Sequence, residues 1–99
     1  MITLRSGDFD ELVGTRFVIS DLDGDDLLVL VRVETMDSPP GMEQFSLVFS
    51  GSAAVAAEQR TYPVHHDTLG DLELFLVPIA QSHDRVEFEA CFSVLVPAD

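Results

Sequence analysis

The stretch Gly70–Pro78, GDLELFLVP, decides the fold of this chain. Side chains alternate between the two faces of a β-strand, so the three leucines of the stretch share one face. The opposite face begins with Glu73 and turns apolar at Phe75 and Val77. A strand of this kind needs a core beneath the leucines and partial cover above Phe75 and Val77. We therefore expect the rest of the chain to supply that cover.

The composition predicts one soluble domain over residues 1–99. Of these residues 46% are apolar, which is enough material for a single hydrophobic core. The net charge is −13, and all five basic residues are arginines. This acidic excess argues against unaided binding to nucleic-acid phosphates or anionic lipids, because both need a basic surface. It favours solubility, tolerance of high salt or a basic partner.

The sequence also predicts a cytoplasmic protein. Residues Met1–Arg5 lack the basic start and apolar run of a signal peptide, and no stretch is long enough to span a bilayer. The one cysteine, Cys91, has no partner in the chain for a disulfide. We expect it to be a small packed side chain of the last strand.

Six strands are expected, joined mostly by short turns. They are Thr15–Ser20, Leu27–Met36, Gln44–Ser50, Arg60–His65, Gly70–Pro78 and Arg85–Val96. A short helix over Ser6–Gly14 precedes them, with Ser6 as its cap and Gly14 at its end. No crossover helix separates the strands. The pattern therefore predicts a mainly β fold, an antiparallel meander that forms a small barrel or a two-layer sandwich.

Two prolines carry positional information. Proline lacks the amide hydrogen that a strand neighbour would accept, so it is confined to edges, strand ends and bulges. Pro63 therefore suggests that its strand lies at an edge. Pro78 is expected to close the strand Gly70–Pro78 near an edge or a bulge.

The same alternation predicts which side chains face inward. The expected inward set, besides the three leucines, is Phe17, Ile19, Leu27, Val29, Val31, Val33, Phe45, Leu47, Phe49, Val86, Phe88, Ala90 and Phe92. The apolar residues left on outward faces are Leu28, Leu30, Val48, Phe75 and Val77. An uncovered apolar patch marks an interface, so these five residues are the candidate protein interface. The alternative is a two-sided core in a closed or layered fold.

Several short motifs carry a resemblance to a known family. They are FSLVFSG at Phe45–Gly51, TYPVHH at Thr61–His66, Leu69-Gly70 and LFLVP at Leu74–Pro78, together with Asp8-Phe9 and Leu12–Gly14 near the start. The chain resembles, over nearly its whole length, an uncharacterised family of small bacterial proteins classified as a domain of unknown function. The family pattern has proline after the histidine that matches His66, where this chain has Asp67.

The resemblance implies little about chemistry. Its motifs are packing and turn motifs, and no catalytic residues carry over from it. Genes of the family tend to lie near genes for phage-tail-like collar and fibre proteins. The resemblance therefore implies an accessory or assembly role.

The acidic stretch Asp21–Asp26, DLDGDD, is the best candidate for metal chemistry. Several carboxylates in a tight loop can supply the oxygen ligands of calcium. An EF-hand loop that started at Asp21 would need glycine at position 26 and glutamate at position 32, but the chain has Asp26 and Arg32. We therefore expect a solvated hairpin turn, with Asp-Gly supplying the turn conformation, and no metal.

No motif indicates catalysis. His65 and His66 point to opposite faces of a strand and cannot easily share a zinc ion with each other or with the distant His83. We expect His66 to form hydrogen bonds in the turn that follows it. No G-x-S-x-G, P-loop or G-x-G-x-x-G sequence occurs. Glu87 and Glu89 lie on the same face of a strand and could be paired catalytic carboxylates. We expect instead that this face is solvated and that they have no catalytic role.

These observations favour a non-enzymatic module that binds another protein or a second copy of itself. It would need no cofactor and no metal, and we expect no direct contact with nucleic acid, membrane or small molecules. The alternative is an acidic DNA mimic that inhibits a nucleic-acid-binding protein, which the charge of −13 and the small size suggest. A barrel that holds an apolar ligand is less favoured, because six strands enclose little space.

Overall fold

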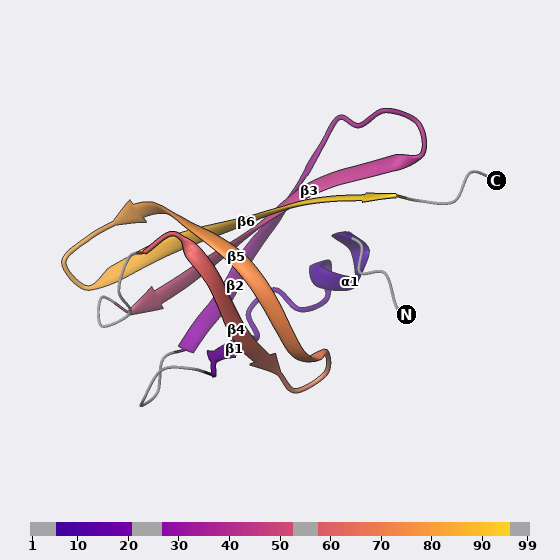
Figure 1. The fold of residues 1–99 in the computed structure, drawn as a ribbon. Coiled ribbons are helices and arrows are strands. Elements are labelled where there is room, and N and C mark those ends of the chain that lie inside the picture. Colours follow the sequence, from indigo (N-terminus) through magenta and orange to yellow (C-terminus); the bar gives the residue numbers. More distant parts are fainter. Residues whose placement is uncertain (1–5, 21–26, 53–57, 96–99) are drawn as a thin grey trace.

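The computed structural model describes residues 6–20, 27–52 and 58–95 (Figure 1). A short helix comes first, and six strands follow it. The elements are α1 (Ser6–Asp10), β1 (Arg16–Ile19), β2 (Leu27–Met36), β3 (Met42–Ser52), β4 (Arg60–His66), β5 (Gly70–Gln81) and β6 (Arg85–Leu95). All paired strands are antiparallel, and they form one sheet that closes into a ring. The predicted fold class is confirmed.

The strand order is β1-β2-β3-β6-β5-β4, and β4 pairs with β1. Each half of the chain is a three-stranded meander, but β3 lies beside β6 instead of β4. The β3–β6 ladder runs without a shift from Met42↔Leu95 to Ser52↔Arg85. The β1–β4 ladder is short and includes only Val18↔His65 and Ile19↔Val64. The order therefore departs from a simple meander at the connection after β3.

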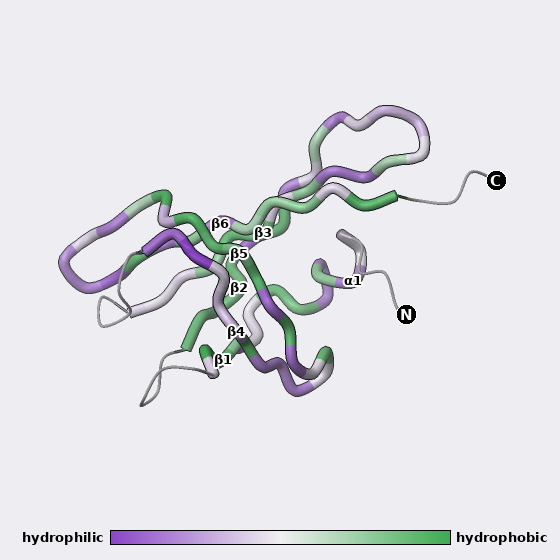
Figure 2. Tube along the Cα trace, viewed as in Figure 1, coloured by the Kyte–Doolittle hydropathy of each residue, from purple (hydrophilic) through white to green (hydrophobic). Residues whose placement is uncertain are grey.

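The core lies on the inner face of the sheet, in the ring and along the arm, and is rich in aromatic side chains. Its buried members are Phe9, Phe17, Ile19, Leu28, Leu30, Phe45, Leu47, Phe49, Tyr62, Val64, Leu74, Leu76, Val86, Phe88 and Ala90. The leucine face of β5 is confirmed, because Leu74 and Leu76 are buried and Leu72 packs against the core. Figure 2 shows the hydrophobic run along the middle of β5.

The inward face of β2 was predicted wrongly up to Val31 and correctly at Val33. Leu28 and Leu30 have no exposed surface and belong to the core, whereas Val31 is 36% exposed. The pairing with β3 passes from Leu30↔Phe49 to Arg32↔Val48, so Val31 is the extra residue of a bulge. A bulge shifts the alternation by one residue, and Val33 therefore packs on the core although it lies an odd number of positions from Leu30.

Part of the sheet extends away from the ring as a three-stranded arm. We define the arm as residues 33–36, 42–47 and 90–95, which come from β2, β3 and β6 (Figure 1). Helix α1 lies against its inner face. The ring of Phe9 lies 5.9 Å from the rings of both Phe45 and Phe92, which stack on each other at 5.1 Å. The N-terminal helix thus covers the inner face of the arm.

The predicted helix over Ser6–Gly14 is too long. Helix α1 ends at Asp10, and turns lead to Gly14, whose φ is 90°. Ser6 is buried, and its backbone amide donates to Glu43 Oε1 at 2.8 Å. Val13 is 45% exposed and does not share the buried face of Phe9, because the helix has ended before it.

Both prolines lie inside paired strands. Pro63 pairs with Glu73 of β5, and its carbonyl oxygen accepts a hydrogen bond from Ser20 N at 2.8 Å. Strand β4 thus has neighbours on both sides, and the predicted edge position is wrong. Strand β5 continues past Pro78 to Gln81, and its ladder with β6 shifts between Pro78 and Ala80. The bulge at Pro78 is confirmed, but the strand does not end there.

Candidate functional site

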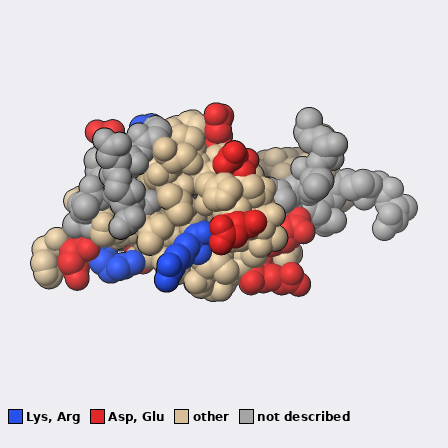
Figure 3. Space-filling view, turned by 90° about the horizontal axis from the view of Figure 1, so that it is seen from below, with Lys and Arg blue, Asp and Glu red and all other residues tan. Residues whose placement is uncertain are grey.

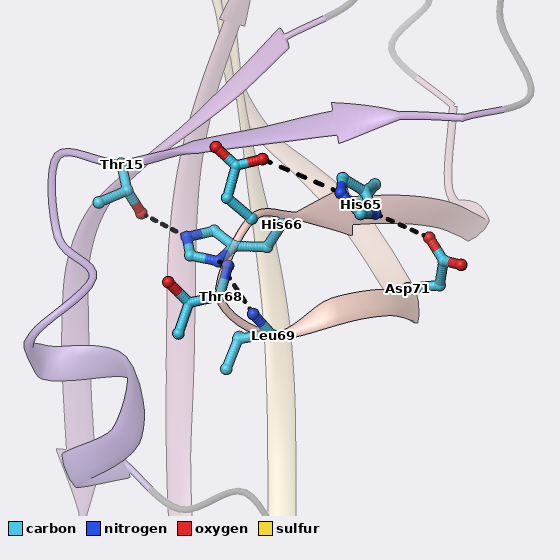
Figure 4. A network of polar contacts seen from close by, with 7 residues as sticks. Thr15, His65, His66, Thr68, Leu69 and Asp71 are labelled. Atoms are coloured by element: carbon cyan, nitrogen blue, oxygen red, sulfur yellow. Dashed lines mark hydrogen bonds and ion pairs between the residues drawn. The ribbon is translucent and has the colours of Figure 1, made fainter.

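His66 is the most buried of the described histidines, with 4% of its surface exposed. Its Nδ1 accepts hydrogen bonds from Thr68 N at 3.0 Å and Leu69 N at 3.3 Å. Its Nε2 lies 2.9 Å from Thr15 Oγ1 (Figure 4). The ring also packs at 4.5 Å from that of Phe17. The predicted hydrogen bonding within the turn is confirmed.

These contacts fix the tautomer of His66. Nδ1 faces two amide donors and must be the unprotonated nitrogen, so Nε2 carries the hydrogen. Thr15 Oγ1 donates to Leu12 O at 2.6 Å, and it can therefore accept from Nε2–H. The imidazole joins the β4–β5 turn to the segment before β1. Both ring nitrogens therefore have hydrogen-bond partners within the chain.

An open surface hollow of about 400 Å³ lies beside this network. Its lining consists of Thr15, Arg16, His66, Asp67 and Thr68. Because both ring nitrogens of His66 already have partners, the hollow holds no free acid–base group from the imidazole. We assign the network a structural role.

The other two histidines are exposed. His65 points away from His66, as predicted, and its Nδ1 lies 2.9 Å from Asp71 Oδ1. His83 lies in the turn between β5 and β6. In residues 6–20, 27–52 and 58–95, no three His, Cys, Asp or Glu side chains come close enough to hold a metal ion. The acidic turn at residues 21–26 lies outside these ranges.

The five residues of the candidate interface separate into two groups. Leu28, Leu30 and Val48 are each 0% exposed. They have no surface for a partner, and their place in the candidate interface is corrected. The bulge in β2 turns Leu28 and Leu30 inward. Val48 does face outward, but it lies between Arg32 of β2 and Glu89 of β6 in the register, and its neighbours cover it.

Phe75 and Val77 remain on the outer face of β5. Phe75 is 52% exposed, and Val77 is half-buried. Ile79, two residues further along, is 44% exposed. We call Phe75, Val77 and Ile79 the β5 strip. The sequence reading missed Ile79 because it ended the strand at Pro78.

Carboxylates and a hydroxyl surround the β5 strip. Thr61 lies opposite Phe75, and Glu89 lies opposite Val77. Glu73 precedes Phe75 on the same face of the strand. The strip is thus an apolar line with acidic side chains at its border. A partner that covers it needs apolar atoms in the centre and basic groups around them.

Charged side chains cover the outer face of the sheet beside the strip. Arg32 Nε donates to Glu34 Oε1 at 2.5 Å. This hydrogen bond raises the pKa of Arg32, and the negative charges of Glu34, Glu87 and Glu89 act in the same direction. Glu87 and Glu89 are half-buried carboxylates, and Glu87 also lines an open surface hollow of about 280 Å³ together with Ser50 and Arg85.

Cys91 is exposed, so the expectation of a packed side chain is wrong. Its thiol donates to Glu89 Oε1 at 3.5 Å. Partial burial of the sulfur raises the pKa of the Cys91 thiol, and the hydrogen bond to Glu89 and the charge of that carboxylate raise it further. A nucleophilic cysteine needs the opposite shift. Cys91 is therefore a poor nucleophile.

Taken together, the described residues form a closed antiparallel sheet with an apolar strip on its outer face. None of their helices is long and apolar enough to cross a membrane. The chain matches the family Domain of unknown function (DUF6916) over residues 4–92, and it belongs to this family. Neither a curated protein nor a solved structure matches the chain.

Proposed function

We propose that the protein is a non-enzymatic interaction module that binds another protein through the β5 strip. The exposure of Phe75 carries this proposal. A phenylalanine in the middle of a strand with 52% of its surface in water has a large apolar area to bury. Val77 and Ile79 extend that area along the same strand. Aromatic anchors of this kind contribute most of the binding energy at protein interfaces.

The charge of the chain narrows the class of partner. The net charge is −13, and Glu73 and Glu89 lie next to the strip. Opposite charges across an interface speed association and select the partner. The partner in this proposal therefore presents an apolar groove with arginine or lysine at its border.

The family resemblance suggests a setting for this partner. The resemblance implies that genes of this family lie near those for phage-tail-like collar and fibre proteins. An accessory or assembly module of such a structure, at work in the cytoplasm, fits a small rigid β scaffold with one binding strip. The neighbouring gene products are therefore the first partners to test.

The test is co-expression of the chain with each neighbouring gene product, followed by affinity purification and size exclusion. We expect a stable complex with the wild type and its loss with Phe75→Thr. Val13→Thr is the matched control, because Val13 is also exposed, at 45%, but lies far from β5 in the sequence, after α1. A complex that survives Phe75→Thr, or a wild type that binds none of the products, would contradict the proposal.

The alternative function, a DNA mimic, rests on the charge of −13 alone. A mimic of the phosphate backbone concentrates its carboxylates in a continuous row. On the face shown in Figure 3, acidic side chains lie in separate groups, with basic groups among them. This scattered distribution gives the mimic less support than the β5 strip gives the interaction module.

A further inference from the structure

Strand β6 changes its surroundings halfway along its length. From Val86 to Glu89 it pairs with β3 on one side and with β5 on the other. From Ala90 to Leu95 it pairs with β3 only, because β5 turns away after Val77↔Glu89. In the part of the chain that the structure describes, this half of β6 is an open edge of the arm (Figure 1).

Open edges attract other strands, and proteins protect them with charges, prolines and bulges. The β2 edge from Val31 to Met36 has such protection, namely a bulge and the Arg32–Glu34 ion pair. The β5 edge from Gly70 to Leu76 carries Asp71 and Glu73. These two edges are therefore poor templates for a further strand.

The β6 edge has no such protection. Residues 90–95 read ACFSVL, with no charge and no proline, and their ladder with β3 shows no shift. Cys91, Ser93 and Leu95 are exposed, and Leu95 is 78% exposed. A well-aligned edge of six uncharged residues is an aggregation hazard unless a partner covers it.

We propose that this edge pairs with the same edge of a second copy of the chain, in an antiparallel dimer. Two molecules that each carry a charge of −13 repel each other over most of their surfaces. Residues 90–95 offer a contact without like charges, and a two-fold axis makes the contact self-complementary. The two arms then form one continuous six-stranded sheet.

The geometry of β-pairing selects the register. In an antiparallel pair, two opposite residues both point their N–H and C=O groups at the other strand, or both point them away. This direction alternates along a strand, so two identical strands that use the same edge pair residues whose numbers differ by an even number. A two-fold axis at Ser93 places Cys91 opposite Leu95 of the second copy. This register keeps all paired residues uncharged and covers Leu95. An axis at Phe92 would place Leu95 opposite Glu89, whose edge already belongs to β5.

The β6 edge is thus a second contact surface, on a different strand from the β5 strip. The test is analytical sedimentation of the purified chain at concentrations from about 10 µM to several hundred µM. This range is needed because a contact between two six-residue edges is small and gives weak association. We expect a shift from monomer towards dimer for the wild type and for Thr35→Lys, which adds the same charge to the β2 edge. Ser93→Lys places a lysine at the two-fold axis and should leave a monomer.

A cross-linking variant tests the register. Leu95→Cys adds a second cysteine, and oxidation should give a covalent dimer, because positions 91 and 95 of opposite strands lie within disulfide reach. The two cysteines of one chain are too far apart along a strand to join each other. The double variant Cys91→Ser, Leu95→Cys is the control and should not cross-link.

Three results would overturn the dimer. They are a wild type that stays monomeric at every concentration, a Ser93→Lys variant that dimerises as the wild type does, and Leu95→Cys chains that do not cross-link. A dimer that Phe75→Thr abolishes and Ser93→Lys leaves intact would move self-association to the β5 strip. That last result would contradict this inference and also the assignment of the β5 strip to a different protein.

Discussion

His66 illustrates how one side chain can join distant parts of a small β fold. Its Nδ1 satisfies two backbone amides of the β4–β5 turn, and its Nε2 reaches Thr15 before β1. Buried polar groups without partners are costly, so the loss of this ring leaves three groups to find new ones. The geometry explains why a histidine in a turn need not be a ligand or a base.

The first prediction follows from these contacts. His66→Ala should lower the free energy of unfolding by about 2 kcal/mol, because it removes three hydrogen bonds and a ring contact with Phe17. Urea unfolding followed by circular dichroism measures the change. His65→Ala is the control and should stay within about 0.5 kcal/mol of the wild type, because His65 is exposed. Equal effects of the two variants would refute the structural role of His66.

The second prediction concerns Cys91. Partial burial and the Glu89 carboxylate raise the pKa of the thiol, so the folded chain holds less thiolate near pH 8 than a free cysteine does. Iodoacetamide should therefore modify the folded protein more slowly than the denatured one. Folding favours the protonated thiol, and this small contribution to stability is lost as the pH rises through the folded-state pKa.

Glu89→Gln separates the two causes of the shift. It removes the charge beside Cys91 and weakens the hydrogen bond, so the pKa of the thiol should fall towards its ordinary value. Alkylation near pH 8 should become severalfold faster. Glu87→Gln changes the same strand without touching Cys91 and should leave the rate as it is. An unchanged rate in Glu89→Gln would exclude the carboxylate as a cause.

At the scale of single elements, the β4–β5 hairpin depends on Gly70. This glycine has φ of 80°, in the region that other residues adopt only with strain. Apart from Gly70 itself and its two chain neighbours, no residue has an atom within 4 Å of the place where a Cβ would be, so backbone strain is what opposes a side chain there. The hairpin positions both His66 and the β5 strip, and the turn conformation therefore supports both.

The third prediction uses this strain. Gly70→Ala should lower the free energy of unfolding by about 1–2 kcal/mol, the cost of a left-handed conformation for a residue with a Cβ. Thermal and urea unfolding measure the effect. Gly7→Ala is the control, because Gly7 lies in α1 without a positive φ and alanine favours helices. If Gly70→Ala were as stable as the wild type, the turn conformation described for Gly70 would be wrong.

The elements also show how far the sequence predicts this fold. Alternation correctly predicts the inward faces of β1, β3, β5 and β6, since each of these strands follows the period of two over its core-facing part. It fails for β2, because one bulged residue, Val31, inverts the faces on either side of it. Nothing in the run LLVLVRV marks that position, since valine fits either face.

The candidate interface could be predicted only in part for a related reason. Phe75 and Val77 are outward by alternation; Phe75 is exposed, and Val77 is half-buried. Val48 is outward too, but its exposure depends on neighbours in β2 and β6 that lie far away in the sequence. The position of Ile79 depends on the bulge near Pro78. Long-range pairing, which local pattern does not contain, decides these cases.

At the scale of the whole molecule, the ring and the arm have different surroundings. The ring buries most of the core, and the β5 strip lies on its outer face. The arm carries α1 on its inner face and ends in the open half of β6. This division separates the two surfaces that we propose, namely the β5 strip for a different protein and the β6 edge for a second copy. Mutation of one should therefore leave the other intact.

Amide hydrogen exchange tests the central proposal, binding through the β5 strip, most directly. It is measured on the chain alone and with a partner found by co-expression, and peptides of β4, β5 and β6 are compared. Binding through the β5 strip should slow exchange in segments that contain Thr61, Phe75 and Ile79 and leave the segment of β1 unchanged. Slower exchange confined to other segments, with β5 exchanging as it does in the free chain, would contradict it.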